Sequence, residues 1–108
     1  MNVRQFLDKF HPKLVETVEG VSSGKLGSES AANLAWEIID TWSSVEADAS
    51  YEPGEETFWC VVWSAQHLSD HEHVSDGAFG RAMDELIPLL KNGKALPKGY
   101  SGSRPDAT

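Results

Sequence analysis

The amino-acid sequence predicts an all-α fold, a small single-domain bundle of four to five helices. Apolar residues recur at helical spacing in several stretches, and no stretch alternates apolar and polar residues over the length of a half-buried strand. The chain has 108 residues, which is enough for one hydrophobic core but not for two. We assign residues 1–96 to the helical bundle. Residues 97–108 have little to bury besides Tyr100, so we expect them to form a flexible C-terminal tail.

The first predicted helix opens the chain. Its apolar stripe consists of Val3, Phe6, Leu7 and Phe10, followed by Leu14, Val15 and Val18. Pro12 lacks a backbone N–H and clashes with the preceding turn, so we expect the helix to stop or kink near His11 and to restart with Pro12 in its first turn. His11, beside this junction, is interpreted as structural or exposed rather than catalytic. Residues 20–27 contain three glycines and are predicted to form a loop.

Ser28 or Ser30 is expected to cap a second helix, because a serine hydroxyl can accept a hydrogen bond from the N–H groups of the first turn. The face predicted to point inward consists of Ala31, Leu34, Ala35, Ile38, Ile39, Trp42 and Val45. Trp36 lies about 100° from Ala35 around the helix axis. Aromatic residues nearby can cover it, so we favour a buried position on a second face over an exposed one.

The most apolar helix is predicted within residues 53–73, PGEETFWCVVWSAQHLSDHEH. Pro53 is expected in its first turn, where Glu55 and Glu56 also favour the positive end of the helix dipole. Apolar residues continue to Leu68 and occupy more than one side of the helix. Such a helix must be covered on more than one side, so we place it at the centre of the bundle.

Asp76 is expected to cap a final helix. Its apolar positions are Phe79, Ala82, Met83, Leu86, Ile87 and Leu90. Pro88 falls inside this pattern, which predicts a kink or a break one turn before the end. Asn92 and Gly93 are then expected to stop the helix.

Cys60 is the only cysteine, which excludes an intramolecular disulfide and is consistent with a reducing compartment. Because it lies within an apolar run, we interpret it as a buried structural thiol. The N-terminus lacks the apolar core of a secretory signal, and nowhere do about 18 apolar residues follow one another. The sequence therefore predicts a cytoplasmic protein.

The distribution of charge indicates the kind of partner. The net charge is −8, and no Lys or Arg occurs between Lys25 and Arg81. That stretch contains Glu29, Glu37, Asp40, Glu46, Asp48, Glu52, Glu55, Glu56, Asp70, Glu72 and Asp76. Such a surface would repel nucleic acid and anionic membranes, and it would attract a basic protein. Acidity that serves only solubility is the competing interpretation.

The connection formed by residues 47–53 places Tyr51 among carboxylates. An aromatic side chain flanked by acids is typical of a protein-binding edge, where the ring supplies contact area and the charges supply steering. A plain turn with Tyr51 resting on the core is the competing interpretation.

Candidates for chemistry are few. His67 and His71 are four residues apart, so they share a helix face and could bind one zinc ion with His73 or Glu72 as a third ligand. However, the glutamate of a HExxH hydrolase is missing, and residues that cap the helix end are the simpler interpretation. Glu37 and Asp40, three apart, are similarly interpreted as a solvated face. No nucleophile elbow or phosphate-binding glycine loop occurs, so we predict a protein that is not an enzyme and needs no cofactor.

The run EETFWCVVWSAQHL, with its acidic start, aromatic doublet and second tryptophan, resembles the central helix of small acidic bacterial immunity proteins. The nearest group accompanies contact-dependent growth inhibition toxins. This resemblance implies a cytoplasmic inhibitor that neutralises one cognate toxin domain, often a basic nuclease, by occluding its active site. The partner-binding residues would then be Asp48, Tyr51, Glu52, Glu55 and Glu56, with Asp70 and Glu72 at the other end of the central helix.

Two alternatives from other classes stay open. The protein could be an all-α adaptor or regulator whose partner is not a toxin. It could also be a metal-binding protein that uses His67, His71 and His73, which zinc-dependent stabilisation would indicate.

Overall fold

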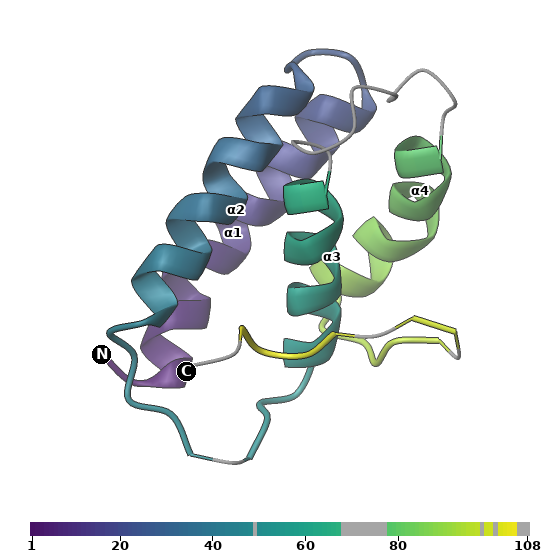
Figure 1. Cartoon of the computed structure of the whole chain (residues 1–108). Helices are drawn as coiled ribbons and strands as arrows, with labels where there is room; N and C mark the ends of the chain where they lie inside the picture. The colour runs from purple at the N-terminus through teal and green to yellow at the C-terminus, as the bar shows by residue number, and fades with distance from the viewer. Residues whose placement is uncertain (49, 68–77, 98, 101, 106–108) are drawn as a thin grey trace.

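The computed structural model describes residues 1–48, 50–67, 78–97, 99–100 and 102–105, and four α-helices lie within these ranges (Figure 1). They are α1 (Val3–Ser22), α2 (Ser28–Trp42), α3 (Glu55–His67) and α4 (Ala78–Lys91). The predicted all-α fold is confirmed. Helix α3 packs against α1, α2 and α4, as its apolar surface on more than one side predicted. In the described part of the chain, no helix is both long enough and apolar enough to cross a bilayer.

Helix α1 is continuous through Pro12, so the predicted stop near His11 is wrong. Proline removes one hydrogen bond of the helix, and tertiary packing offsets that loss because Phe10 and Leu14 on either side are buried. His11 has the structural role that was predicted, since its Nε2 donates to the backbone carbonyl of Leu90 (2.6 Å). The helix also extends to Ser22, which includes the first three residues of the predicted loop.

Helix α2 begins at Ser28, but neither predicted serine caps it. The N-cap is Gly27, which makes no side-chain cap hydrogen bond. The inward face is as predicted: Ala31, Ala35, Ile38 and Trp42 are buried, and Leu34, Ile39 and Val45 are partly buried. Trp36 is half exposed, so the prediction of a buried Trp36 is wrong.

Helix α3 begins at Glu55, two residues after Pro53, rather than with proline in its first turn. The intervening Gly54 has a φ of +81°, and a Cβ built on it would lie 3.1 Å from the backbone of Gly93. Glycine therefore allows both the turn and the close approach to the end of α4. Glu55 occupies the first turn of the helix as a result, and it is buried.

Helix α4 runs to Lys91 without a break at Pro88. The predicted stop is confirmed: Asn92 donates to the carbonyl of Pro88 from both its backbone and its side chain, and Gly93 has a φ of +63°. Asp76, the predicted cap, lies outside the described residues.

The core is dominated by aromatic rings from three helices. Phe6 of α1 contacts Trp42 of α2 and Trp59 of α3, with ring centroids 5.2 and 5.7 Å apart. Trp42 and Trp59 meet edge to face at 5.0 Å. Such ring pairs add to the free energy gained by burying apolar area. Cys60 is also buried, as predicted, and this burial raises the pKa of its thiol.

The described residues near the C-terminus pack against the bundle, although the sequence predicted that this segment buries little besides Tyr100. Residues 102–105, here called the C-terminal strap, cross α3 (Figure 1). Gly102 is buried, and a Cβ built on it would lie only 1.7 Å from the backbone oxygen of Glu56. A glycine at this position is therefore what lets the strap lie directly on the helix.

Candidate protein-binding site

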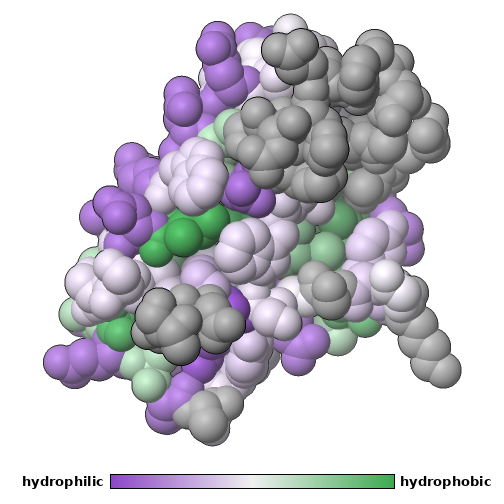
Figure 2. Space-filling view, in the orientation of Figure 1, coloured by the Kyte–Doolittle hydropathy of each residue, from purple (hydrophilic) through white to green (hydrophobic). Residues whose placement is uncertain are grey.

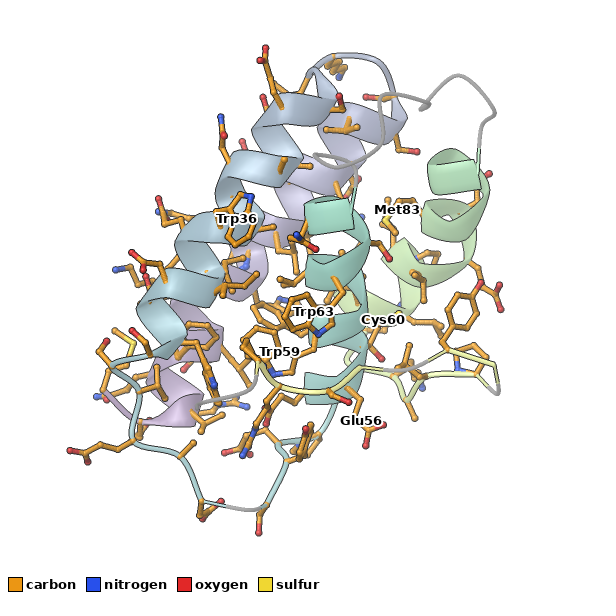
Figure 3. The ribbon with its side chains drawn as sticks, viewed as in Figure 1. Trp36, Glu56, Trp59, Cys60, Trp63 and Met83 are labelled. Atoms are coloured by element: carbon orange, nitrogen blue, oxygen red, sulfur yellow. The ribbon has the colours of Figure 1, made fainter. Side chains whose placement is uncertain are left out.

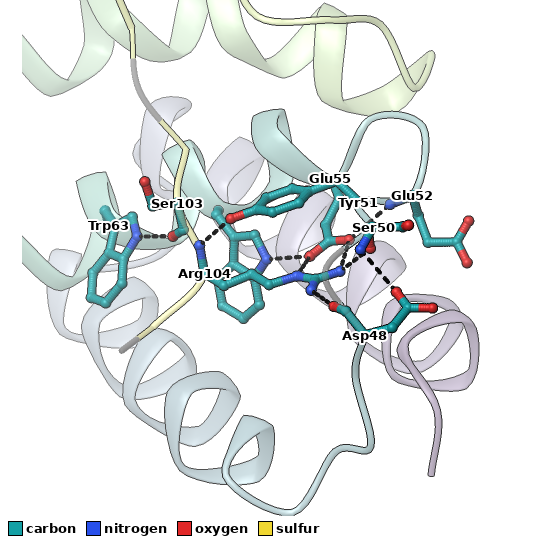
Figure 4. Close-up of polar contacts among 9 residues, drawn as sticks. Asp48, Ser50, Tyr51, Glu52, Glu55, Trp63, Ser103 and Arg104 are labelled. Atoms are coloured by element: carbon teal, nitrogen blue, oxygen red, sulfur yellow. Dashed lines mark hydrogen bonds and ion pairs between the residues drawn. The ribbon is translucent and has the colours of Figure 1, made fainter. Parts of the chain in front are cut away.

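Glu55 is the polar centre of the region where the strap meets α3. Its side chain is fully buried, yet each carboxylate oxygen has partners. Oε2 accepts from Trp59 Nε1 (2.9 Å), and Oε1 accepts from the backbone N–H of Glu52 (2.9 Å). Arg104 donates to both oxygens, from Nη2 to Oε1 at 2.9 Å and from Nε to Oε2 (Figure 4). The burial cost of this charge is thus offset by a two-pronged ion pair and two further hydrogen bonds.

The surroundings of Glu55 act on its pKa in opposite directions. Burial raises the pKa, because it disfavours the charged form. The hydrogen bonds from Arg104, Glu52 and Trp59, together with the positive charge of Arg104, lower it and outweigh burial. The pKa of Glu55 therefore lies below its ordinary value, and the group is ionised at neutral pH. The same hydrogen bond to Glu55 raises the pKa of Arg104.

Arg104 is held by more than its ion pair. Its guanidinium lies 4.3 Å from the ring centroid of Tyr51 and 5.2 Å from that of Trp42. It also donates from Nη1 to the backbone oxygen of Asp48 and from Nη2 to that of Ser50 (Figure 4). Aromatic faces and carbonyl oxygens both favour a planar cation. Arg104 thereby joins the 47–53 connection to the first turn of α3.

Two backbone groups fix the strap beside this guanidinium. Trp63 Nε1 donates to the carbonyl oxygen of Ser103 (2.7 Å), and the N–H of Arg104 donates to the hydroxyl of Tyr51 (3.0 Å). Both partners come from elements far away in sequence. The strap therefore contacts the bundle through three successive residues. Gly102 packs against the backbone of Glu56, Ser103 accepts through its carbonyl, and Arg104 donates from its side chain and its N–H.

An open groove of about 900 Å³ lies between α2, the connection that follows α2, and the strap. Its apolar part includes Trp36, Ile39, Trp42 and Val45, and its acidic part consists of Glu37, Asp40 and Asp48. Figure 3 places Trp36 on the face of α2 that points toward the viewer. Figure 2 shows hydrophilic residues along the outer edge of α2 and hydrophobic residues on the face that α2 and α3 share. A half-exposed tryptophan among carboxylates is the composition of a protein contact surface.

The structure separates the residues predicted to bind a partner. Asp48 lines the groove, and Tyr51, 41% exposed, stacks on Arg104. Glu52 is half-buried beside Glu55. Glu56 is exposed, and Figure 3 shows it across the strap from Trp36. Glu55 is buried and paired, so its assignment as a contact residue for an outside partner is corrected: its carboxylate organises the site from within.

The remaining predicted residues are only partly described. Asp70, Glu72, His71 and His73 lie outside the described residues, and of His67 the structure describes only its position as the last residue of α3. Among the residues that are described, no three His, Cys, Asp or Glu side chains are grouped as a metal ion would require. The zinc alternative thus stays a prediction.

Sequence reasoning missed two residues of the site, for different reasons. Trp36 shares a helix face with Asn33, three residues before it, and Asp40, four residues after it, and these polar neighbours indicated an exposed position. Arg104 pairs with a residue 49 positions away, and no local pattern predicts such a contact. The one available hint was Glu55 itself, an acid four residues before Trp59 in an apolar helix.

Comparison of the chain with protein-family models, with curated proteins and with solved structures finds no match.

Proposed function

We propose that this protein is a cytoplasmic immunity protein that binds and neutralises a cognate toxin domain with a basic surface. It would act by occlusion, covering the Lys and Arg side chains with which a nuclease holds phosphates. The protein itself would perform no chemistry and need no cofactor.

The observation that carries the proposal is that most of the described acids between Lys25 and Arg81 are not neutralised by a basic side chain of the described chain. Among the described residues, one acid between Lys25 and Arg81 forms an ion pair, and that acid is the buried Glu55. The other described acids of the stretch have no ion-pair partner: Glu29, Glu37, Asp40, Glu46, Asp48, Glu52 and Glu56. Their charges remain available to steer and pair with a basic partner.

The groove supports the same proposal by its shape and composition. Binding energy at protein interfaces is concentrated in a few aromatic or Arg anchors surrounded by weaker contacts. Trp36 is half exposed and its backbone is already fixed in a helix, so little conformational entropy would be lost when a partner covers it. Glu37, Asp40 and Asp48 surround it with negative charge. A basic side chain of the partner could therefore stack on the indole and pair with a carboxylate.

The test is a pull-down of the tagged protein with the product of the gene immediately upstream, at low and at high salt. The proposal expects a one-to-one complex with a basic partner, and it expects co-expression to relieve that partner's toxicity. A complex with a partner that is not toxic would instead support the adaptor alternative. If no complex forms at either salt concentration, the result contradicts the proposed inhibitor function and the choice of the upstream gene product as the partner.

A further inference from the structure

We propose that Trp42, Tyr51, Glu55 and Trp63 form a binding site for a peptide-linked arginine, which the chain's own Arg104 occupies. An arginine from another peptide or protein would enter this site when the C-terminal strap is displaced. The inference does not depend on the partner's being a toxin.

The anionic floor of the site is built independently of Arg104. The carboxylate of Glu55 is held by Trp59 Nε1 and by the backbone N–H of Glu52. Removing Arg104 would thus leave an oriented, buried carboxylate that lacks its countercharge, and such a group strongly favours a replacement cation. The aromatic faces of Tyr51 and Trp42 and the carbonyls of Asp48 and Ser50 select a planar guanidinium over an ammonium.

The site also recognises backbone groups on the N-terminal side of the arginine. Trp63 Nε1 donates to the carbonyl of the preceding residue, Ser103, and Tyr51 accepts from the N–H of Arg104 itself. An acylated arginine presents both groups, whereas free arginine has a charged amino group and no preceding carbonyl. The expected ligand is therefore an arginine within a peptide rather than the free amino acid.

The position of the site explains how an outside arginine could reach it. Arg104 and Pro105 line the open groove beside Trp36, so the guanidinium site borders a surface that a partner can approach. In the resting chain, Arg104 occupies the site because its covalent attachment gives it a high effective concentration. A partner bound in the groove would likewise hold its own arginine at a high effective concentration next to the site.

The experiment uses the full-length Arg104→Ala variant and the probe N-acetylarginine methylamide, with binding measured by calorimetry. We expect Arg104→Ala to bind the probe about tenfold or more tightly than wild type does, since wild type must first release its own arginine. N-acetyllysine methylamide should bind about tenfold more weakly than the arginine probe, because it lacks the guanidinium fork. Free arginine tests recognition of the backbone groups, and it should bind more weakly than N-acetylarginine methylamide to the variant whose strap is displaced, Gly102→Val, in which Trp63 and Tyr51 are no longer occupied by the strap. Adding Glu55→Gln to Arg104→Ala should abolish binding of the probe.

A second variant displaces the strap and keeps Arg104. Gly102→Val places a side chain where the backbone of Glu56 lies, so it should lift the strap and admit the probe. Ser103→Ala is the matched control, because Trp63 contacts only the backbone carbonyl of Ser103. This variant should bind the probe as weakly as wild type does.

Two results would overturn the proposal. A folded Arg104→Ala that binds the arginine and lysine probes equally would show that no guanidinium site exists. If Arg104→Ala is unfolded instead, millimolar probe should restore its helical circular dichroism by mass action, and failure to restore it would be equally decisive.

Discussion

The guanidinium of Arg104 closes over the buried carboxylate of Glu55, although 49 residues separate the two. The pair connects three parts of the chain: the C-terminal strap, the connection before α3, and the first turn of α3. Among the described acids between Lys25 and Arg81, Glu55 is thereby neutralised inside the protein, whereas the others form no ion pair. The paired Glu55 belongs to the interior of the fold, and the unpaired acids belong to the proposed binding surface.

Glu55→Gln should lower the free energy of unfolding by about 3 kcal/mol, because breaking a buried ion pair leaves an uncompensated charge. Urea denaturation would measure the loss. The neighbouring Glu56→Gln removes the same charge from an exposed position and should change the free energy of unfolding by less than about 0.5 kcal/mol. Equal effects of the two variants would contradict the role given to Glu55.

The contribution of Glu55 should depend on pH with a definite sign. Because its pKa is lowered in the folded state, the stabilisation is fully present above its ordinary pKa near 4.5. It is lost as the pH falls from there through the lower pKa of the folded protein. The difference in unfolding free energy between wild type and Glu55→Gln should therefore be constant near neutral pH and shrink below pH 4.5. A difference that grows on acidification would contradict the lowered pKa.

Truncating Trp59 and truncating Trp36 should change the stability of the protein by very different amounts. Trp59 is fully buried among Phe6, Trp42 and Phe58, so Trp59→Ala should lower the free energy of unfolding by about 3–5 kcal/mol. Trp36 is 50% exposed, and Trp36→Ala should change it by only about 0.5 kcal/mol. Circular dichroism during thermal unfolding would compare them. A large loss in Trp36→Ala would mean that Trp36 stabilises the fold and is not held for a partner.

Cys60 should be inert in the native protein. Its side chain is buried, and burial raises the pKa of its thiol, so little reactive thiolate exists at neutral pH. A disulfide reagent such as Ellman's should label it only after unfolding in guanidinium chloride. Rapid labelling under native conditions would show instead that α3 opens or that the thiol is reactive.

Local periodicity predicted the helices and most of the buried face of each. It succeeded for α2 and α3 because their apolar spacing is a property of neighbouring residues. It failed at Pro12, where packing on both sides of the proline outweighs one lost hydrogen bond, and at Trp36, where aromatic character was given more weight than its polar helix face. Periodicity could not predict the strap. Gly102 has no side chain, and Arg104 lies 49 residues from Glu55, so neither contact produces a repeating pattern in the sequence.

The most direct test of the proposed function measures the affinity of the purified protein for the upstream gene product by calorimetry. Wild type is compared with a groove variant that neutralises Glu37, Asp40 and Asp48. The control neutralises three exposed acids elsewhere, Asp8, Glu16 and Asp84, so that the net charge of the two variants is equal.

The groove variant should bind roughly tenfold or more weakly than wild type, since close charge pairs couple by about 1.5 kcal/mol or more. Trp36→Ala should lose about 30-fold if it is an anchor worth about 2 kcal/mol. The control should stay within about threefold of wild type at physiological salt, where charges far from the contact are screened. Equal losses in the groove and control variants, with Trp36→Ala unchanged, would show that net charge alone attracts the partner and would contradict the groove as the binding surface.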